Sequence, residues 1–371
     1  MGQSTAKAST FKDSGDGFCE TKQLRWGFSS MQGWRPYMED AHFALASLGG
    51  AWSDTAAFGV MDGHGGREVA RFCQRRLPMA ISQGERLEPR TSLERAVESM
   101  DGLLRSEEES DYLQSLVDRT RDNPLAAWGA RRVGCTAAIC LVQVESILVA
   151  NVGDSRVVLS QRGQAVPLSE DHKPNLPRER ERIERAGGVV EQQQAGPLTT
   201  FRINGNLNLS RSIGDLDYKN DLQLPPGEQI ISSVPDVLEH RRDAADEFVL
   251  IASDGIWDRI GSQEAVDFVR RKLQEGGETS LSQIMEDLLD ECFSPDLMKT
   301  GGLGGDNMTA LLVLVEMNPH SPTRSMSRNL VMEKPFLRTK GSGSGPSDGT
   351  FEFDFLTKLC SCHPSDTRYS L

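Results

Sequence analysis

The sequence predicts an α+β fold with antiparallel sheets. Apolar runs of strand length occur in groups, and longer segments with helical periodicity separate the groups. Grouped strands favour antiparallel sheets, whereas strict alternation of strand and helix favours a parallel sheet. The chain has 371 residues, of which 37% are hydrophobic, so it can bury a substantial core.

Strands are predicted where apolar and β-branched residues cluster in short runs. These runs span residues 55–61, 137–144, 147–152, 157–160, 248–252 and 308–315. Gly153-Asp154-Ser155 separates two of the runs and is typical of a hairpin connection, because glycine and aspartate favour tight turns.

Helices are predicted from capping and stop signals. Thr91 with Glu94, and Ser280 with Gln283, have the spacing of capping boxes. An apolar series at helical spacing follows Ser280, namely Ile284, Leu288, Leu289 and Cys292. Helical patterns over residues 179–186 and 263–275 each stop at a Gly-Gly pair. Each of these helices should bury one face.

Charge and cysteine usage disfavour several classes of protein. The formal net charge of -13 at pH 7 argues against a nucleic-acid binder, which needs clustered Lys and Arg. No run approaches the ~20 apolar residues of a membrane span, and residues 1–22 lack the apolar stretch of a signal peptide. The seven cysteines include no C-x-x-C pair, which fits reduced thiols. A cytoplasmic or nuclear protein is expected.

Four acidic motifs lie beside predicted strands. They are Glu39-Asp40, Asp62-Gly63-His64-Gly65-Gly66, Asp254-Gly255 and Asp306-Asn307. A lone Asp-Gly pair is usually a turn, but four such motifs at strand ends would bring several carboxylates together. Facing carboxylates repel one another unless cations neutralise them. The sequence therefore predicts a divalent metal site.

Ligand chemistry narrows the choice of metal. Carboxylates without nearby cysteines suit Mg²⁺ or Mn²⁺. Zinc is disfavoured because no two of the six histidines are spaced i, i+4, and the twelve-residue calcium loop is absent. Two ions about 3.5–4 Å apart, bridged by Asp62, could orient a hydroxide towards a phosphorus atom. Hydrolysis of a phosphate monoester would follow.

Arg35 and His64 lie close in sequence to these motifs. Arg35 precedes Glu39 by four residues and could bind a phosphate dianion through its guanidinium group. His64 follows Asp62 and could protonate the leaving oxygen. Taken singly, each is more often structural, as an ion-paired surface arginine or as a histidine near the start of a helix.

Several longer motifs occur in one characteristic order. They occupy residues 29–35 with 38–42, then 62–66, 151–156, 171–174, 210–215, 253–258 and 305–309. Together they resemble the metal-dependent type 2C Ser/Thr protein phosphatases over roughly residues 25–317, and several motifs in one order are far more specific than a single match. The resemblance implies an αββα sandwich of two antiparallel sheets flanked by helix pairs, with a dinuclear metal site at one end.

The resemblance also implies the metal ligands and cofactors. In the family pattern Asp62 bridges two Mn²⁺ or Mg²⁺ ions. Asp254 and Asp306 complete the ligands of one ion, and the Gly63 carbonyl binds the other. Glu39 and Asp40 act mostly through bound water. Asp154 and Asp258, which alone fit loop or capping positions equally well, would hold a weaker third ion.

Two catalytic roles and a substrate-binding element are implied in the same way. Arg35 would bind the substrate phosphate, and His64 would be the general acid. The family's flap would lie between about residues 173 and 235, with Arg211 near its base, and would govern substrate choice.

Composition predicts three segments. Residues 1–22 would be a flexible N-terminal tail, residues 23–317 the catalytic domain, and residues 318–371 a flexible C-terminal tail with a short apolar and cysteine-containing segment. Gly2 resembles a myristoylation site, although Ala6 departs from the stricter pattern, and Cys360 and Cys362 could be palmitoylated. Membrane attachment through one acyl chain would be reversible. The C-terminal segment could equally be a docking peptide, or pack back onto the domain.

The leading hypothesis is a protein serine/threonine phosphatase that hydrolyses phosphoserine and phosphothreonine with a metal-activated water. Phosphorylated proteins would be its substrates, nucleic acid would not be a partner, and a monomer is expected. One alternative is a pseudophosphatase that only binds partners, which should lack a metal ligand, whereas Asp62, Asp254 and Asp306 are all present. The other is a different two-metal phosphoesterase, which the same site chemistry permits.

Overall fold

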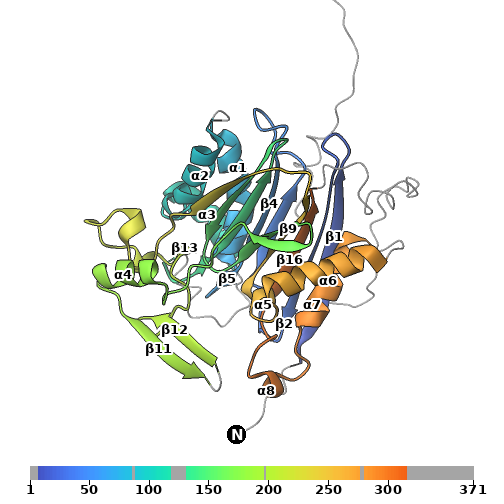
Figure 1. The fold of residues 1–371 in the computed structure, drawn as a ribbon. Coiled ribbons are helices and arrows are strands. Elements are labelled where there is room, and N and C mark those ends of the chain that lie inside the picture. The colour runs from blue at the N-terminus through green and yellow to red at the C-terminus, as the bar shows by residue number, and fades with distance from the viewer. Residues whose placement is uncertain (1–6, 86–87, 118–130, 196–197, 276–279, 316–371) are drawn as a thin grey trace, which may run out of the picture. The chain divides into compact units, whose positions relative to one another are not determined.

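The computed structural model of this protein describes residues 7–85, 88–117, 131–195, 198–275 and 280–315. These residues form two antiparallel sheets between layers of helices, as Figure 1 shows. The predicted α+β class and the αββα sandwich that the family resemblance implies are therefore confirmed.

Sheet A has the strand order β1-β2-β16-β15-β9-β10, and each neighbouring pair is antiparallel. Its strands are β1 (Ser9–Cys19), β2 (Leu24–Gly33), β9 (Arg156–Gln161), β10 (Gln164–Pro167), β15 (Asp246–Ala252) and β16 (Met308–Leu314).

Sheet B has the order β14-β8-β7-β4-β3 and is also antiparallel throughout. Its strands are β3 (Ala41–Leu45), β4 (Ala56–Met61), β7 (Ala137–Val142), β8 (Ser146–Val152) and β14 (Asp236–Arg241). All the strands predicted from sequence are present in the two sheets, with bounds within about two residues of those expected.

Side-chain alternation along the strands builds three apolar layers. Phe58 and Val60 of β4 lie in the same buried cluster as Val249 and Ile251 of β15, which fills the space between the sheets. The outer face of sheet B packs under α1 (Glu68–Gln83) and α2 (Pro89–Leu104). The outer face of sheet A packs under α6 (Ser262–Glu275) and α7 (Leu281–Cys292).

The two capping boxes have different outcomes. The Ser280 hydroxyl accepts a hydrogen bond from the Gln283 backbone N–H at the start of α7, as predicted. The box at Thr91 is wrong, because α2 already begins at Pro89 and Thr91 lies inside the helix. Proline suits a first helical position, since its missing N–H would have no partner there.

Smaller elements surround the sandwich. A short sheet combines β5 (Gly63–His64), β6 (Gly134–Cys135) and β13 (Ile213–Gly214), and a hairpin pairs β11 (Val190–Ala195) with β12 (Leu198–Ile203). The short helices are α3 (Ser110–Leu116), α4 (Pro177–Arg185), α5 (Asp254–Trp257), α8 (Leu297–Thr300), η1 (Glu107–Glu109), η3 (Leu216–Tyr218) and η4 (Pro226–Glu228). In Figure 1 the hairpin and α4, both within the predicted flap, lie beside the sandwich.

The predicted N-terminal tail is wrong for its described part. Residues 9–19 form β1, the edge strand of sheet A, instead of a flexible segment. Asp16 of β1 accepts hydrogen bonds from the backbone N–H and the hydroxyl of Ser282 in α7. A side chain at Gly17 would overlap the ring of Trp26, so the small residues of this segment serve packing. The folded domain thus begins before residue 23.

The predicted hairpin at residues 153–155 is also wrong. β8 belongs to sheet B and β9 to sheet A, so this segment crosses from one sheet to the other. Gly153 has φ of 103°, and a Cβ there would lie 2.6 Å from the Thr136 side chain. Glycine is required for this sharp crossing. None of the helices among the described residues is long and apolar enough to cross a membrane.

Candidate active site

The carboxylates predicted from sequence gather at one end of the sandwich. The antiparallel registers place the end of β4 beside the start of β3, and the end of β15 beside the start of β16. Asp40, Asp62, Asp254 and Asp306 flank these four strand ends. Two sheets therefore deliver four acidic side chains to one region.

Burial and mutual repulsion disfavour the ionised forms of the central carboxylates. Burial raises the pKa of Asp62 well above its ordinary value, and the Asp254, Asp40 and Asp306 carboxylates raise it further. Burial likewise raises the pKa of Asp254, followed by the charges of Asp154 and Asp306. Such a cluster is stable in its charged form only when cations neutralise it.

Asp40 has the most buried of these side chains. Its Oδ2 accepts a hydrogen bond of 3.0 Å from the Ser253 hydroxyl, whereas its buried Oδ1 has no partner among the described residues. Burial raises the pKa of Asp40 to about 7 and the Asp306 carboxylate raises it further, whereas the hydrogen bond from Ser253 lowers it. A buried oxygen without a donor suits a bound cation, or a water molecule held by one.

The donor set fits hard divalent cations, although the side chains do not form a closed coordination sphere. Among the described residues, no three His, Cys, Asp or Glu side chains are arranged so that they could already hold a metal ion. Two of the carboxylates instead pair with cationic side chains, Asp306 with Arg35 and Asp154 with Lys173. Metal binding would replace or adjust these pairs.

The main chain of Asp62 is fixed by Thr136. The Thr136 hydroxyl accepts a hydrogen bond of 3.0 Å from the Asp62 N–H, and the Thr136 N–H donates to the Asp62 carbonyl at 2.9 Å. The next residue, Gly63, packs so closely on Glu39 that a Cβ would lie 2.3 Å from the Glu39 carbonyl. A glycine is therefore needed at this point, and it keeps the Glu39 loop beside Asp62.

Arg35 reaches the same region from the loop after β2. Its Nη2 lies 2.5 Å from Oδ2 of Asp306, and its side chain remains 59% exposed, which leaves the guanidinium accessible to a ligand. Asn307 holds this loop, since its Oδ1 accepts from the Glu39 N–H and its Nδ2 donates to the carbonyls of Gln32 at the end of β2 and Tyr37 in the loop.

Asp154 and Asp258 form an acidic group beside Asp254. Asp154 is buried, and its Oδ2 lies 2.5 Å from Nζ of Lys173, whereas Asp258 is exposed. Burial disfavours the charged ammonium, but the carboxylates of Asp154, Asp254 and Asp258 outweigh it and raise the pKa of Lys173. Lys173 therefore forms an ion pair with Asp154 of this group.

His64 is paired with a residue distant in sequence. Its Nε2 lies 2.6 Å from Oδ2 of Asp215, a buried carboxylate. Burial opposes protonation of the imidazole, but the Asp215 charge and hydrogen bond prevail and raise the pKa of His64. In turn, the pKa of Asp215 is lowered: burial acts in the opposite sense and is outweighed by His64.

Arg211 anchors the flap segment to the sandwich. It donates to Glu179 of α4 at 2.6 Å and to Asp236 at the start of β14 at 2.9 Å. Arg182 also pairs with Glu179, at 2.8 Å. Burial favours protonation of Glu179, but Arg211 and Arg182 overcome it and lower its pKa to about 2.

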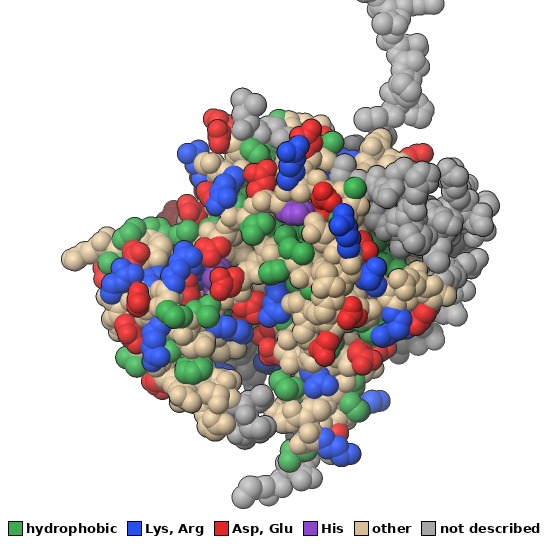
Figure 2. Space-filling model, viewed as in Figure 1, with side chains coloured by type: hydrophobic (Ala, Val, Ile, Leu, Met, Phe, Trp, Pro, Cys, Tyr) green, Lys and Arg blue, Asp and Glu red, His purple; other side chains and the backbone are tan. Residues whose placement is uncertain are grey.

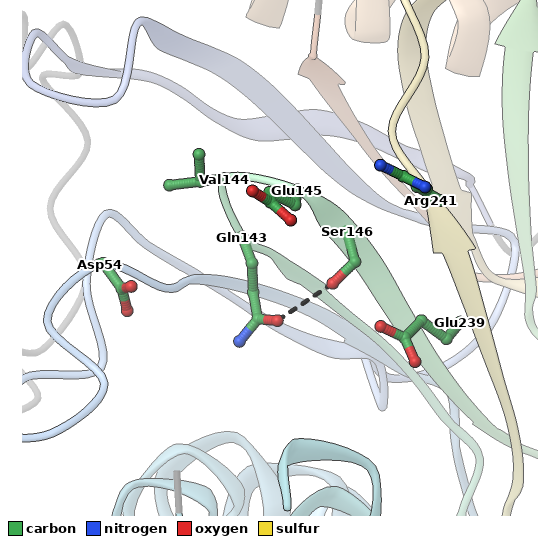
Figure 3. Close-up of a pocket in the computed structure, with 7 residues that line it drawn as sticks. All are labelled: Asp54, Gln143, Val144, Glu145, Ser146, Glu239 and Arg241. Atoms are coloured by element: carbon green, nitrogen blue, oxygen red, sulfur yellow. Dashed lines mark hydrogen bonds between the residues drawn. The ribbon is translucent and has the colours of Figure 1, made fainter. Parts of the chain in front are cut away.

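A surface pocket lies away from this site. Figure 3 shows it at the turn between β7 and β8, with lining side chains that include Gln143, Glu145 and Glu239. The turn is at the opposite end of β7 from Ala137, which pairs with Val152 beside the acidic group. The pocket is therefore distinct from the carboxylate site.

The family follows from a match over most of the folded region. A family model described as protein phosphatase 2C matches residues 24–301. This chain belongs to the protein phosphatase 2C family. As a member it is a serine/threonine protein phosphatase, a Mg²⁺- or Mn²⁺-dependent hydrolase whose substrates are phosphorylated proteins. The identification made from sequence motifs is confirmed.

Protein phosphatase 2C relatives cover most of the chain. "Probable protein phosphatase 2C 11" of Oryza sativa subsp. japonica is 38% identical over 341 residues, which cover 84% of this chain and 89% of the relative. "Protein phosphatase 2C homolog 2" of Schizosaccharomyces pombe is 40% identical over 317 residues, which cover 84% and 78%. A phosphatase structure from Toxoplasma gondii, 23% identical, aligns with a TM-score of 0.60 over 79% of this chain and 93% of that one, and it supports the fold.

Two side chains of the phosphatase 2C site received no role from the sequence. Asp215 lies in one of the family-like motifs, but its partner His64 is 151 residues away, so spacing could not connect them. Lys173 lies in another motif beside His172, and only the fold brings it to Asp154. The only sequence signal for either residue was that a charged side chain lies inside one of the family-like motifs.

Proposed function

We propose that this phosphatase 2C acts with two Mg²⁺ or Mn²⁺ ions at the strand-end carboxylates. The ligands would be the side chains of Asp62, Asp254 and Asp306 and the Gly63 carbonyl, with Glu39 and Asp40 acting through water. Bound ions would supply a nucleophilic water at neutral pH and neutralise the substrate phosphate. The observation that carries the proposal is the buried Oδ1 of Asp40, which lacks a partner among the described residues beside three further carboxylates.

Arg35 and His64 would act directly on the substrate. The exposed Arg35 guanidinium would bind oxygens of the phosphate dianion, for which its planar fork is suited. The attacking water forms the new O–P bond, and the bond between phosphorus and the Ser or Thr oxygen breaks. His64 would give its proton to that leaving oxygen, so that a neutral hydroxyl departs.

A weaker third ion would bind at Asp154 and Asp258, beside Asp254. The closeness of these carboxylates to Lys173 supports this assignment, since one ammonium group balances only one of three negative charges. The flap, residues 173–235, would govern which phosphoproteins enter, because α4 and the β11–β12 hairpin lie beside the sandwich. Arg211 ties α4 to the start of β14.

The decisive experiment is phosphate release from a phosphothreonine peptide with Mn²⁺, with Mg²⁺ and with EDTA. We expect release with either metal, none with EDTA, and a loss of several orders of magnitude in Asp62→Asn. A folded protein that released no phosphate with either metal would contradict the proposal and favour a pseudophosphatase. Metal-dependent release that survived in Asp62→Asn would show that the Asp62 carboxylate is not needed to hold the metal.

We propose that the protein acts in the cytoplasm or nucleus as a monomer, with reversible attachment to membranes. Gly2, Cys360 and Cys362 are the candidate acylation sites, and all three lie outside the described residues. On the face seen in Figure 2, basic and acidic side chains are interspersed, which favours protein substrates over nucleic acid. Deletion of residues 318–371 should change location and leave turnover of a small phosphopeptide intact; loss of turnover would refute this.

A further inference from the structure

The carboxylate of Asp215 forms a short hydrogen bond with the His64 ring. Its Oδ2 lies 2.6 Å from Nε2 of His64, within the range of a strong charge-assisted hydrogen bond. An ionised carboxylate can only accept, so Nε2 is the donor and carries a proton. Nδ1 of His64 makes no hydrogen bond to another described residue, so it is the ring nitrogen left for a ligand.

The backbone at Asp215 is held in an unusual conformation. Its φ is 49°, in the left-handed region, which few residues other than glycine, asparagine and aspartate adopt readily. The Asp215 N–H donates to the Val133 carbonyl at 3.0 Å, and the Ser212 hydroxyl donates to Oδ2 at 2.6 Å. These two hydrogen bonds fix both the backbone and the carboxylate of Asp215.

Close packing leaves room for this pair only because residue 134 is a glycine. A Cβ at Gly134 would lie 2.2 Å from Oδ2 of Asp215 and 2.6 Å from Nε2 of His64. β6 contributes this glycine and pairs with β5, which carries His64, and with β13, which precedes Asp215. The short three-stranded sheet therefore brings the two side chains together.

We propose that Asp215 is the positioning residue of the general acid: it holds the His64 ring with Nε2–H towards itself, so that Nδ1–H is presented to the leaving oxygen. The inference rests on the proposed role of His64. During the reaction the Nδ1 proton passes to the leaving oxygen as its bond to phosphorus breaks. The Nε2–H stays on Asp215, and solvent returns the lost proton to Nδ1.

Leaving-group dependence distinguishes this role from a structural one. A phosphothreonine peptide has a poor leaving group that needs a proton, whereas p-nitrophenyl phosphate has a good one that hardly does. General acids contribute about 10²–10⁴-fold, so His64→Gln should lower kcat on the peptide by roughly that factor and on p-nitrophenyl phosphate by less than about tenfold. Asp215→Asn should lose about 10–10²-fold on the peptide with the same preference, and Asp215→Glu should recover part of it.

Asp101 of α2 offers a matched control, because it contacts the same loop as Asp215 without touching His64. Its Oδ1 accepts from the Gly214 N–H at 2.8 Å and its Oδ2 pairs with Lys219 at 2.6 Å, without contact to His64. Asp101→Asn should lower stability and affect both substrates equally. The double variant of His64→Gln with Asp215→Asn should be no slower on the peptide than His64→Gln alone. When two residues act as a unit, the effects of their substitutions on kcat do not add.

The outcomes separate the inference from the proposed function. Equal losses on both substrates in His64→Gln would refute the general-acid role and with it this inference. Suppose that His64→Gln loses activity mainly on the peptide. If Asp215→Asn then keeps both activities, or loses both equally, Asp215 does not position the acid. In that case the proposed role of His64 stands. Thermal unfolding of each variant shows whether it has folded.

Discussion

The Arg35 guanidinium lies 2.5 Å from the carboxylate of Asp306, so the proposed phosphate binder is paired with a proposed metal ligand. Both side chains are partly exposed, and an exposed ion pair of this kind contributes little to stability. A metal ion at Asp306 and a phosphate at Arg35 would each offer a stronger partner than the pair itself. The contact is therefore suited to exchange when substrate and metal bind.

Replacement of Arg35 should weaken substrate binding. A hydrogen bond to a charged group contributes about 1.5–3 kcal/mol, so Arg35→Ala should raise KM for a phosphopeptide roughly 10–100-fold with a smaller effect on kcat. Steady-state kinetics at saturating Mn²⁺ measures this. Arg90→Ala is the control, because Arg90 pairs with Glu94 on the exposed surface of α2. An unchanged KM would place Arg35 outside the site.

Asp62→Asn should separate catalysis from folding. Removal of one of several mutually repelling carboxylates relieves a destabilising interaction, so the metal-free variant should unfold at a temperature equal to or above that of the unsubstituted protein. Its turnover should nonetheless fall by several orders of magnitude. Thermal unfolding in EDTA and phosphate release with Mn²⁺ measure the two effects. A variant that is much less stable would contradict the repulsion argument.

Divalent metal should stabilise the protein. A ligand that binds only the folded state adds about 2.7 kcal/mol at a concentration of 100 times its Kd. Addition of Mg²⁺ or Mn²⁺ to EDTA-treated protein should therefore raise Tm, and chelation should reverse the rise. In Asp62→Asn the rise should be much smaller. No shift in the unsubstituted protein would mean that the carboxylates do not hold a metal.

The clustering of the acidic residues proposed as metal ligands could be predicted from sequence, because each flanks a strand. Asp62 directly follows an apolar run, Asp254 follows another after Ser253, and antiparallel sheets bring such strand ends together. β1 could not be predicted in this way, because its sequence is mostly polar and its strand state depends on pairing with β2 and on the contact of Asp16 with Ser282. Local pattern identifies elements with their own apolar signal, whereas long-range contacts decide the others.

The local sequence pattern also could not predict how some strands are connected or which distant side chains pair. The residues around Asp154 have turn chemistry in either case, and only the assignment of β8 and β9 to different sheets shows that the chain crosses there. The pairing of Asp215 with His64 depends on the three-stranded sheet, whose strands of two residues each carry no periodic signal.

Lys173 should oppose binding of the third ion. Its ammonium lies 2.5 Å from Asp154, and two unit charges 4 Å apart interact by about 4 kcal/mol at an effective dielectric constant near 20. Because the ammonium can move aside, we expect Lys173→Met to tighten the weakest Mn²⁺ site by about tenfold. Calorimetric titration with Mn²⁺ measures it, with Lys272→Met, which removes the Lys272–Asp287 pair, as control. Unchanged or weaker binding at that site would contradict the expectation.

Glu179 should stabilise the fold in a pH-dependent manner. Its pKa is lowered to about 2 from an ordinary 4.5, so its contribution is complete above pH 4.5 and is lost as the pH falls towards 2. That contribution is roughly 3 kcal/mol. At pH 7 Glu179→Gln should cost about 3–5 kcal/mol, because Arg182 and Arg211 stay buried without their counter-charge.

Urea unfolding at several pH values tests the Glu179 network against a neighbour on the same helix. The difference in unfolding free energy between the unsubstituted protein and Glu179→Gln should shrink steadily below pH 4.5, because protonated Glu179 and glutamine are both neutral. Glu184→Gln breaks only the exposed pair with Arg180, so it should cost less than about 1 kcal/mol at any pH. A difference for Glu179→Gln that stayed constant from pH 7 to pH 3 would show that shape and hydrogen bonding, and not charge, hold α4 to Arg211.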